Sequence, residues 1–219
     1  MSRTHRLLQV VPLLAVAGLS GSCSYFGGSD IESIYLATKQ AWAGGNKVTL
    51  QEAAAVPYAS VGMRLSDSSQ IMLLLASDQN GELLWTSAER MAIKTRDGRI
   101  VGTAGFKYNL GGYTSANRTA ADRTTEVIRW QGDFPDLGLF GIPIECRDRF
   151  VGDETIVILG KDIHTRRMEE DCKSRSSLLD WSFTNIYWLD PTSSLVWRSV
   201  QHVNPKLDAI EIEILRPPA

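Results

Sequence analysis

Residues 71–99 read IMLLLASDQNGELLWTSAERMAIKTRDGR, a stretch in which short apolar runs alternate with turn signals. The continuous apolar run Ile71–Ala76 is typical of a strand that is buried on both faces. Asp78–Gly81 and Asp97-Gly98 supply the turns, because Asp, Asn and Gly tolerate the backbone conformations that tight turns need. The pattern predicts consecutive short strands joined by hairpin turns.

The turn at residues 97–98 also predicts which side chains share a face. Pairing across it places Met91, Ile93 and Ile100 together on one face, which we expect to be buried. Lys94, Arg96 and Arg99 fall on the other face, which we expect to be in contact with water.

A second hairpin is predicted, with strands over residues 181–189 and 195–203 and a turn at residues 190–194; within it, residues 185–203 read NIYWLDPTSSLVWRSVQHV. If Asp190 lies opposite Leu195, Trp188 falls opposite Trp197, which is a favourable cross-strand aromatic pair. The alternation of Ile with Glu over residues 210–214 predicts one further, half-exposed strand.

The remaining chain has the same character. The capping-box spacing of Ser29 and Glu32, followed by apolar residues at helical spacing, predicts an amphipathic helix over residues 30–43. Residues 111–125 and 132–143 are expected to be loops, and the charged run 166–171 a solvated loop. Further strands are predicted over residues 59–65, 83–86, 91–96, 99–103, 126–131, 144–151, 155–159 and 163–168. The fold class is therefore mainly β, an antiparallel barrel or strongly curved sheet of about ten strands with one N-terminal amphipathic helix.

The first 22 residues are typical of a secretory signal peptide. Arg3 and Arg6 precede an apolar run from Leu7 to Leu19, which is too short to span about 30 Å of hydrocarbon. Small residues follow, up to Cys23. We expect residues 1–22 to be the signal peptide, residues 23–29 a tether, and residues 30–219 a single β-rich domain.

Residues 20–23, Ser-Gly-Ser-Cys, resemble the lipobox of bacterial lipoproteins, in which the Cys thiol is acylated and becomes the new N-terminus. Leu19 lies one position earlier than that pattern prefers. The interpretation predicts a lipid anchor at Cys23; cleavage without acylation would instead leave a soluble periplasmic protein. Ser24 follows the Cys where an Asp would signal retention in the inner membrane, so the resemblance implies an outer-membrane location.

Composition excludes several classes of protein. The formal net charge of −2 lacks the basic footprint of a nucleic-acid-binding protein. The sequence contains none of the common nucleotide-binding, hydrolase or metalloprotease motifs. His164 and His202 have no metal-ligand spacing to other residues. We therefore predict no catalytic residues, no metal and no cofactor.

Two cysteines remain once Cys23 is assigned to the lipid. In an oxidising compartment Cys146 and Cys172 are candidates for a disulfide, which would contribute about 3 kcal/mol in the loop-entropy account. The alternative is a pair of buried free thiols.

Exposed aromatic faces stack on sugar rings, which makes the six Trp residues candidates for contact with a glycan. Trp85, Trp188 and Trp197 are the three that we single out for this role. The alternative for each is a place in the β core, where Trp is commonly buried.

The chain resembles the YjbF/GfcB family of group 4 capsule polysaccharide lipoproteins. The resemblance rests on residues 71–99 and on the Y-W-L-D-P, W-R-S and Gln201 pattern of residues 185–203, and it extends over about residues 30–217. It implies a mainly β, barrel-like lipoprotein at the periplasmic face of the outer membrane, encoded with polysaccharide secretion machinery. It implies no reaction. The chain departs from relatives at Ser193-Ser194, where a Gly is expected.

These features favour a non-enzymatic accessory factor in exopolysaccharide or capsule export, with the secretion machinery or the polysaccharide as partner. One alternative is a periplasmic lipid or lipoprotein carrier with an apolar cavity. A less favoured alternative is a polysaccharide hydrolase, which needs two carboxylates about 5–10 Å apart. Asp133, Asp136 and Asp190 are the loop acids to consider for it.

Overall fold

The computed structural model of the protein describes residues 47–66, 68–115 and 127–218. The expected signal peptide, the tether with Cys23 and the helix expected over residues 30–43 lie outside these residues. The described chain forms one antiparallel sheet, preceded by a short helix, α2 (Leu50–Ala55).

The sheet contains twelve strands in the order β5-β4-β3-β2-β1-β12-β11-β10-β9-β8-β7-β6. Strands that are consecutive in the chain pair with each other, except β5 and β6, which are the two edges. Strand β1 pairs with β12 and so joins the first five strands to the last seven. The strands are β1 (Ser60–Leu65), β2 (Ile71–Gln79), β3 (Glu82–Thr86), β4 (Ala92–Arg96), β5 (Arg99–Ala104), β6 (Gly112–Ser115), β7 (Val127–Phe134), β8 (Leu139–Ile158), β9 (Lys161–Ser174), β10 (Ser182–Leu189), β11 (Val196–Gln201) and β12 (Ile210–Arg216).

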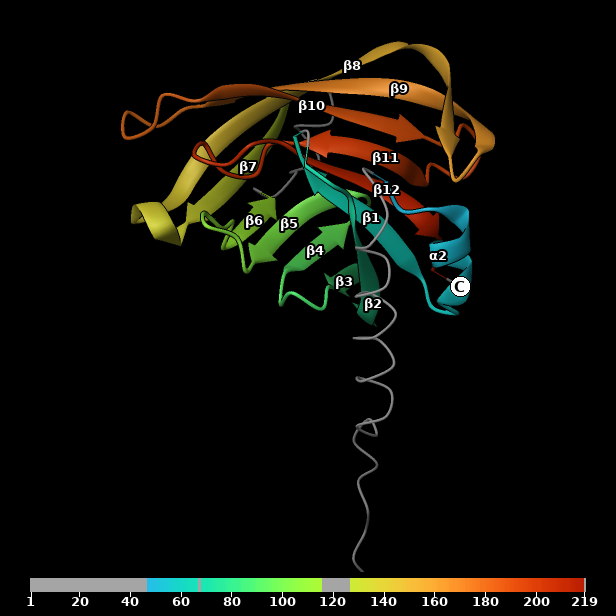
Figure 1. The fold of residues 1–219 in the computed structure, drawn as a ribbon. Helices are drawn as coiled ribbons and strands as arrows, with labels where there is room; N and C mark the ends of the chain where they lie inside the picture. Colours follow the sequence, from blue (N-terminus) through green and yellow to red (C-terminus); the bar gives the residue numbers. More distant parts are fainter. Residues whose placement is uncertain (1–46, 67, 116–126, 219) are drawn as a thin grey trace, which may run out of the picture.

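The sheet curls until its two edge strands, β5 and β6, lie close together (Figure 1). Two bonds hold this seam: the amide of Thr103 donates to the carbonyl of Leu110 at 2.9 Å, and the amide of Leu110 donates to Thr103 Oγ1 at 2.8 Å. The predicted antiparallel, strongly curved β fold is therefore confirmed, as a sheet nearly closed into a barrel.

The expected number of about ten strands is wrong, and so are two expected loops. Strand β6 lies within residues 111–125, where the small polar residues lack the apolar alternation that is typical of a strand. The expected loop 132–143 is the end of β7, a 3-10 turn (Pro135–Leu137) and the start of β8. The expected strands 144–151 and 155–159 are one strand, because a bulge between Phe150 and Gly152 absorbs the apparent break.

Helix α2 is absent from the sequence prediction, although its start carries a recognisable signal. Thr49 Oγ1 accepts a bond from the amide of Glu52 at 3.3 Å, and the amide of Thr49 donates to Glu52 Oε2 at 2.7 Å, a complete capping box. The helix packs on one face of the sheet through a small apolar cluster of Val48, Ala53, Val56, Met72 and Leu74. We call this face the outer face and the opposite one the inner face.

The inner face carries the main core. Ile93 and Ile100 are both fully buried there, as predicted. Phe134, Ile144 and Trp85 belong to the same cluster, which draws on nearly every strand of the sheet. The curl of the sheet thus converts one face into an interior.

The β8–β9 hairpin is much longer than its neighbours, and its far end folds over the outer face toward α2 (Figure 1). Ile156 and Ile158 pack there against Trp188. Arg198 Nη2 donates to the carbonyl of Val157 at 2.9 Å. The outer face of β10–β12 is therefore covered by a second layer made of the same sheet.

Candidate functional site

A buried ion pair joins Arg99, at the start of β5, to Glu170 on β9. The side chains are 14% and 1% exposed. The expectation that Arg99 faces water is wrong. It shares a face with Arg96, its partner across the turn, but the curl of the sheet lays this face against β7–β10.

Glu170 lies in strand β9, so the expectation of a solvated loop over residues 166–171 is also wrong. Its carboxylate accepts bonds from Asn185 Nδ2 at 2.9 Å and Tyr187 Oη at 3.4 Å. Burial tends to lower the pKa of the Arg99 guanidinium, but Tyr187 and Glu170 more than offset this, and the pKa lies above its ordinary value. Arg99 is therefore a fixed cation. Burial raises the pKa of Tyr187, which remains a neutral phenol.

Gln201 on β11 holds the backbone of the β4–β5 turn. Its Nε2 donates to the carbonyl of Gly98 at 2.8 Å, and its Oε1 accepts from the amide of Ile100 at 2.9 Å. Ser199 Oγ and Tyr187 Oη occupy the remaining bonding positions of the amide. The Gln201 side chain thus bonds a backbone carbonyl and a backbone amide of the turn, as a neighbouring strand would, and links the turn to β11.

A cleft of about 490 Å³ lies beside this network, between the β4–β5 hairpin and strands β7–β11. Arg99 stands over the ring of Trp130, 4.5 Å from its centroid, and 5.7 Å from that of Tyr187. Asp97 and Asp148 are polar members of the wall. The apolar lining is Val101, Ile128, Met168, Leu189 and Val196.

A second cavity of about 680 Å³ lies on the other side of the Asp97-Gly98 turn. Trp85, singled out from the sequence, lines it but is only 2% exposed, and its Nε1 donates to Thr95 Oγ1 at 2.9 Å. Trp85 is therefore a core residue with one edge on a cavity.

Trp188 and Trp197 lie away from both spaces. The predicted Trp188–Trp197 pair is wrong: Asp190 does bond to Leu195, but a bulge shifts the register, so Trp188 faces Arg198. Trp188 Nε1 donates to Glu154 Oε2 at 3.0 Å on the outer face. Three aromatic residues chosen from the sequence thus do not form one surface.

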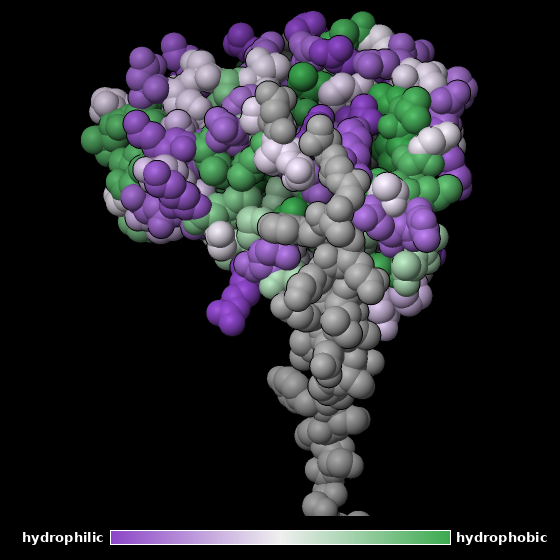
Figure 2. Space-filling model, in the orientation of Figure 1, coloured by the Kyte–Doolittle hydropathy of each residue, from purple (hydrophilic) through white to green (hydrophobic). Residues whose placement is uncertain are grey.

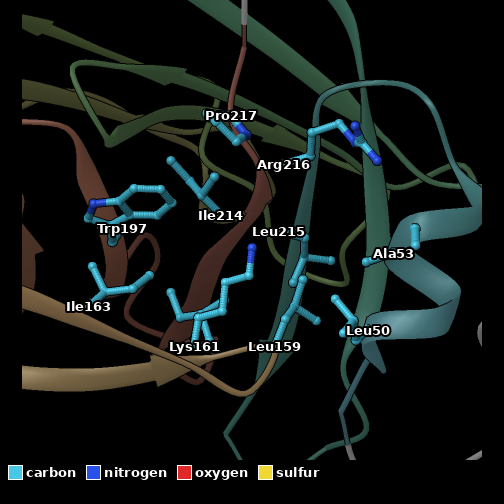
Figure 3. Close-up of a pocket in the computed structure, with 12 residues that line it drawn as sticks. Leu50, Ala53, Leu159, Lys161, Ile163, Trp197, Ile214, Leu215, Arg216 and Pro217 are labelled. Atoms are coloured by element: carbon cyan, nitrogen blue, oxygen red, sulfur yellow. The ribbon is translucent and has the colours of Figure 1, made fainter.

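Trp197 lines a third pocket, of about 310 Å³, between the end of the β8–β9 hairpin, β12 and α2. In Figure 3 the ring of Trp197 and the side chain of Ile163 enter it from one side, and Leu50 of α2 lies on the other. Figure 2 shows hydrophobic residues gathered over the end of this hairpin. Val157 and Leu50 are more than half exposed there.

Cys146 and Cys172, which were the predicted disulfide candidates, form a disulfide between directly opposed residues of β8 and β9. With Glu170 they make the single grouping of possible metal ligands within the described residues. Because both thiols are used in the disulfide, this grouping offers a metal only one carboxylate.

The three loop acids considered for hydrolysis each hold a turn. Asp133 Oδ1 accepts from the amide of Gly141 at 2.7 Å, and Asp136 Oδ2 accepts from the amide of Asn109 at 2.6 Å. Asp190 caps its own turn, where bonds from the amides of Ser193 and Thr192 lower its pKa. Each of these carboxylates is bound to backbone amide groups.

Comparison with known proteins identifies the family. The sequence model of the family described as "Group 4 capsule polysaccharide lipoprotein gfcB, YjbF" matches residues 37–215. The chain belongs to this family. The "Uncharacterized lipoprotein GfcB" of Escherichia coli K12 is 22% identical over 173 residues, covering 76% of this chain and 80% of that protein.

One solved structure shows the same fold. The crystal structure of the hypothetical lipoprotein YmcC from Escherichia coli K12 matches with a TM-score of 0.63 and 22% identity, over 80% of this chain and 91% of that one. A putative exported protein from Bacteroides fragilis with a YmcC-like fold matches with a TM-score of 0.34 and 12% identity, over 72% and 93% of the two chains. In the described residues no helix is long and apolar enough to cross a membrane.

The YjbF/GfcB resemblance in residues 185–203 has a structural basis. Asn185, Tyr187 and Gln201 are the residues that bind Glu170 and the β4–β5 turn. Sequence reasoning missed Arg99 and Glu170 themselves. The spacing of Met168, Glu170 and Cys172 at every second position was the available signal that Glu170 faces the core.

Proposed function

We propose that this member of the capsule polysaccharide lipoprotein family is a non-enzymatic accessory factor in exopolysaccharide or capsule export or assembly. It acts at the periplasmic face of the outer membrane, held there by a lipid on Cys23. The observation that carries the proposal is the family match over residues 37–215, which spans almost the whole sheet.

The chemistry of the described residues supports a binding role rather than catalysis. The buried carboxylate Glu170 is paired with Arg99, and Glu213 is paired with Lys47 and Arg198. A general acid or base must be able to exchange a proton with a substrate at the operating pH. Carboxylates held by cations and amides in this way are suited to fixing a scaffold.

Deletion and complementation test the proposal. Cells that lack the protein should secrete less polysaccharide while their synthesis enzymes keep full activity, and the native chain should restore secretion. The variant Cys23→Ala should be found in the soluble periplasmic fraction and should restore secretion poorly. Unchanged secretion in the deletion strain would contradict the proposal.

The cavity of about 680 Å³ favours a second candidate, a carrier of lipid or lipoprotein acyl chains. Its walls are mostly apolar, with Val61, Leu83, Trp85, Ile212 and Ile214 among them, and its size is within the range of about 300–1,000 Å³ for small-molecule sites. Native mass spectrometry of the purified protein should then show a bound lipid. Leu83→Trp, which fills the cavity, should remove it.

A further inference from the structure

We propose that the cleft between the β4–β5 hairpin and strands β7–β11 binds a neutral sugar unit of a polysaccharide. The inference rests on the proposed function and names the site and the ligand class that it requires. Three properties of the cleft carry the argument: spare donors on Arg99, acceptors on its wall, and apolar surface between them.

Arg99 has hydrogen-bonding capacity that the described residues do not use. A guanidinium carries five N–H donors, and the bond from Nη2 to Glu170 is the one that Arg99 makes within the described part of the chain. The ring of Trp130 contacts the face of the guanidinium, which leaves the donors at its edge available. A largely buried cation with open donors is suited to a ligand rich in oxygen acceptors.

The charge of the cleft favours a neutral ligand over an acidic one. Glu170 already neutralises Arg99, and Arg96, next to the turn, is paired with Glu82. Asp97 adds a carboxylate to the lining. An anionic ligand would meet this carboxylate, whereas sugar hydroxyls can donate to it and accept from Arg99.

The rest of the lining matches the apolar faces of a sugar ring. Val101, Ile128 and Met168 present aliphatic surface from β5, β7 and β9. The volume of about 490 Å³ is within the range of small-molecule sites. Donors, acceptors and C–H surface therefore meet in one space of suitable size.

The position of the cleft is fixed before any ligand binds. Gln201 binds the backbone of the β4–β5 turn beside Arg99. Glu170, which accepts a bond from Asn185, holds the Arg99 side chain. Rigid side chains lose little conformational entropy on binding, so they support affinity for a flexible polymer. The Arg99–Glu170 ion pair therefore holds the Arg99 donors in place at the cleft.

The test uses the full mature chain in detergent and oligosaccharides released from the exopolysaccharide of the producing cell, separated by anion exchange into neutral and acidic fractions. Saturable binding of the neutral fraction, followed by Trp fluorescence and by saturation-transfer NMR, is expected. Binding to the acidic fraction alone, or no saturable binding of either fraction, would overturn the proposal.

Two variants locate the site. Met168→Trp fills the cleft and should abolish binding, whereas Ile163→Trp places the same bulk on β9 in the pocket near α2 and should leave it intact. Arg96→Ala should weaken binding by about tenfold through loss of a charged donor. Its control is Lys94→Ala, because Lys94 pairs with the same Glu82 but does not line the cleft. Equal affinities for a variant and its control would place the ligand elsewhere.

Secretion separates this inference from the proposed function. If the deletion strain is defective and Met168→Trp restores full secretion, the accessory role holds and the cleft proposal fails. If deletion has no effect on secretion while the neutral fraction binds at the cleft, the proposed function fails and the site holds. Melting temperatures of all four variants show whether each is folded.

Discussion

The β4–β5 and β8–β9 hairpins turn in the same way and end in opposite surroundings. Asp97 and Gly98 have φ values of 50° and 76°, and Leu159 and Gly160 have 50° and 74°. A Cβ added at Gly98 would lie 2.3 Å from a methyl group of Val196, whereas one added at Gly160 meets nothing within 4 Å. The same backbone turn is therefore packed against Val196 in one hairpin and is open in the other.

The difference arises from what holds each tip. Gln201 and the Arg99–Glu170 pair fix the β4–β5 tip inside the sheet. The β8–β9 tip is held on the outer face by apolar contacts with Trp188 and by the bond from Arg198 to Val157. Polar groups buried in the interior need partners, so the inner tip depends on a complete network and the outer tip does not.

Breaking the ionic anchor of the inner tip should have the largest effect. Glu170→Ala leaves Arg99 buried without a counter-ion, and loss of one partner of a buried pair costs about 3–5 kcal/mol. The neighbouring Glu169→Ala is the control, because Glu169 pairs with the more exposed Arg149 and Arg167, and it should cost less than about 1 kcal/mol. Urea unfolding measures the free energy of unfolding of both variants. Similar losses for Glu170→Ala and Glu169→Ala would contradict the special role of the buried pair.

Removing the cross-link within the long hairpin should be next in size. The double variant Cys146→Ala/Cys172→Ala removes a cross-link between residues with a sequence separation of 26. In the loop-entropy account this lowers the free energy of unfolding by about 3 kcal/mol. Thermal unfolding with and without reductant should show the same loss in the native chain and none in the variant. Two alkylatable thiols in the folded protein without reductant would show that the disulfide is absent.

The two turn glycines give the most direct comparison. Gly98→Ala and Gly160→Ala carry the same cost of a left-handed residue, but Gly98→Ala also collides with Val196. We expect Gly98→Ala to lower the free energy of unfolding by about 2 kcal/mol more than Gly160→Ala. Equal losses would mean that the inner tip moves freely, and would remove the basis for a preformed cleft.

A pH-dependent effect is expected on the outer face, at Glu213, which binds Arg198 and so supports the outer tip. Burial tends to raise the pKa of Glu213, but bonds from Gln70 and Lys47 and the charge of Arg198 lower it below its ordinary value of 4.5. Its stabilisation is therefore complete above about pH 4.5 and lost as the pH falls through the lower folded pKa.

Melting temperatures between pH 3 and pH 6 test this. Glu213→Gln should be less stable than the native chain near pH 6, and the difference should shrink toward pH 3. Glu89→Gln, at an exposed turn, should follow the native profile at every pH. A constant difference between Glu213→Gln and the native chain would contradict the assignment.

Turn chemistry and alternation were sufficient to predict most strands of this sheet. Asp97-Gly98 and residues 190–194 form the expected turns, and Ile93 and Ile100 are buried as expected. These features depend on neighbours in the chain, which the sequence displays directly. The same holds for the Cys pair, which followed from counting thiols.

Features that depend on the curl of the sheet could not be predicted in this way. Arg99 is indistinguishable from Arg96 by local pattern, and only the approach of β7–β10 buries one and not the other. The bulge that moves Trp197 away from Trp188 depends on pairing across two strands. The candidate cleft combines residues from both halves of the sheet, so no single stretch of sequence contains it.

The cross-strand disulfide also acts as a register lock. In a hairpin as long as β8–β9, a slip of one residue would turn every side chain of β9 to the opposite face. Such a slip would expose Glu170 and bury Glu169, which would remove the counter-ion of Arg99. The covalent bond between Cys146 and Cys172, two residues from Glu170, excludes this alternative alignment. Oxidation of the two thiols would then commit the sheet to the alignment in which Arg99 and Glu170 are paired.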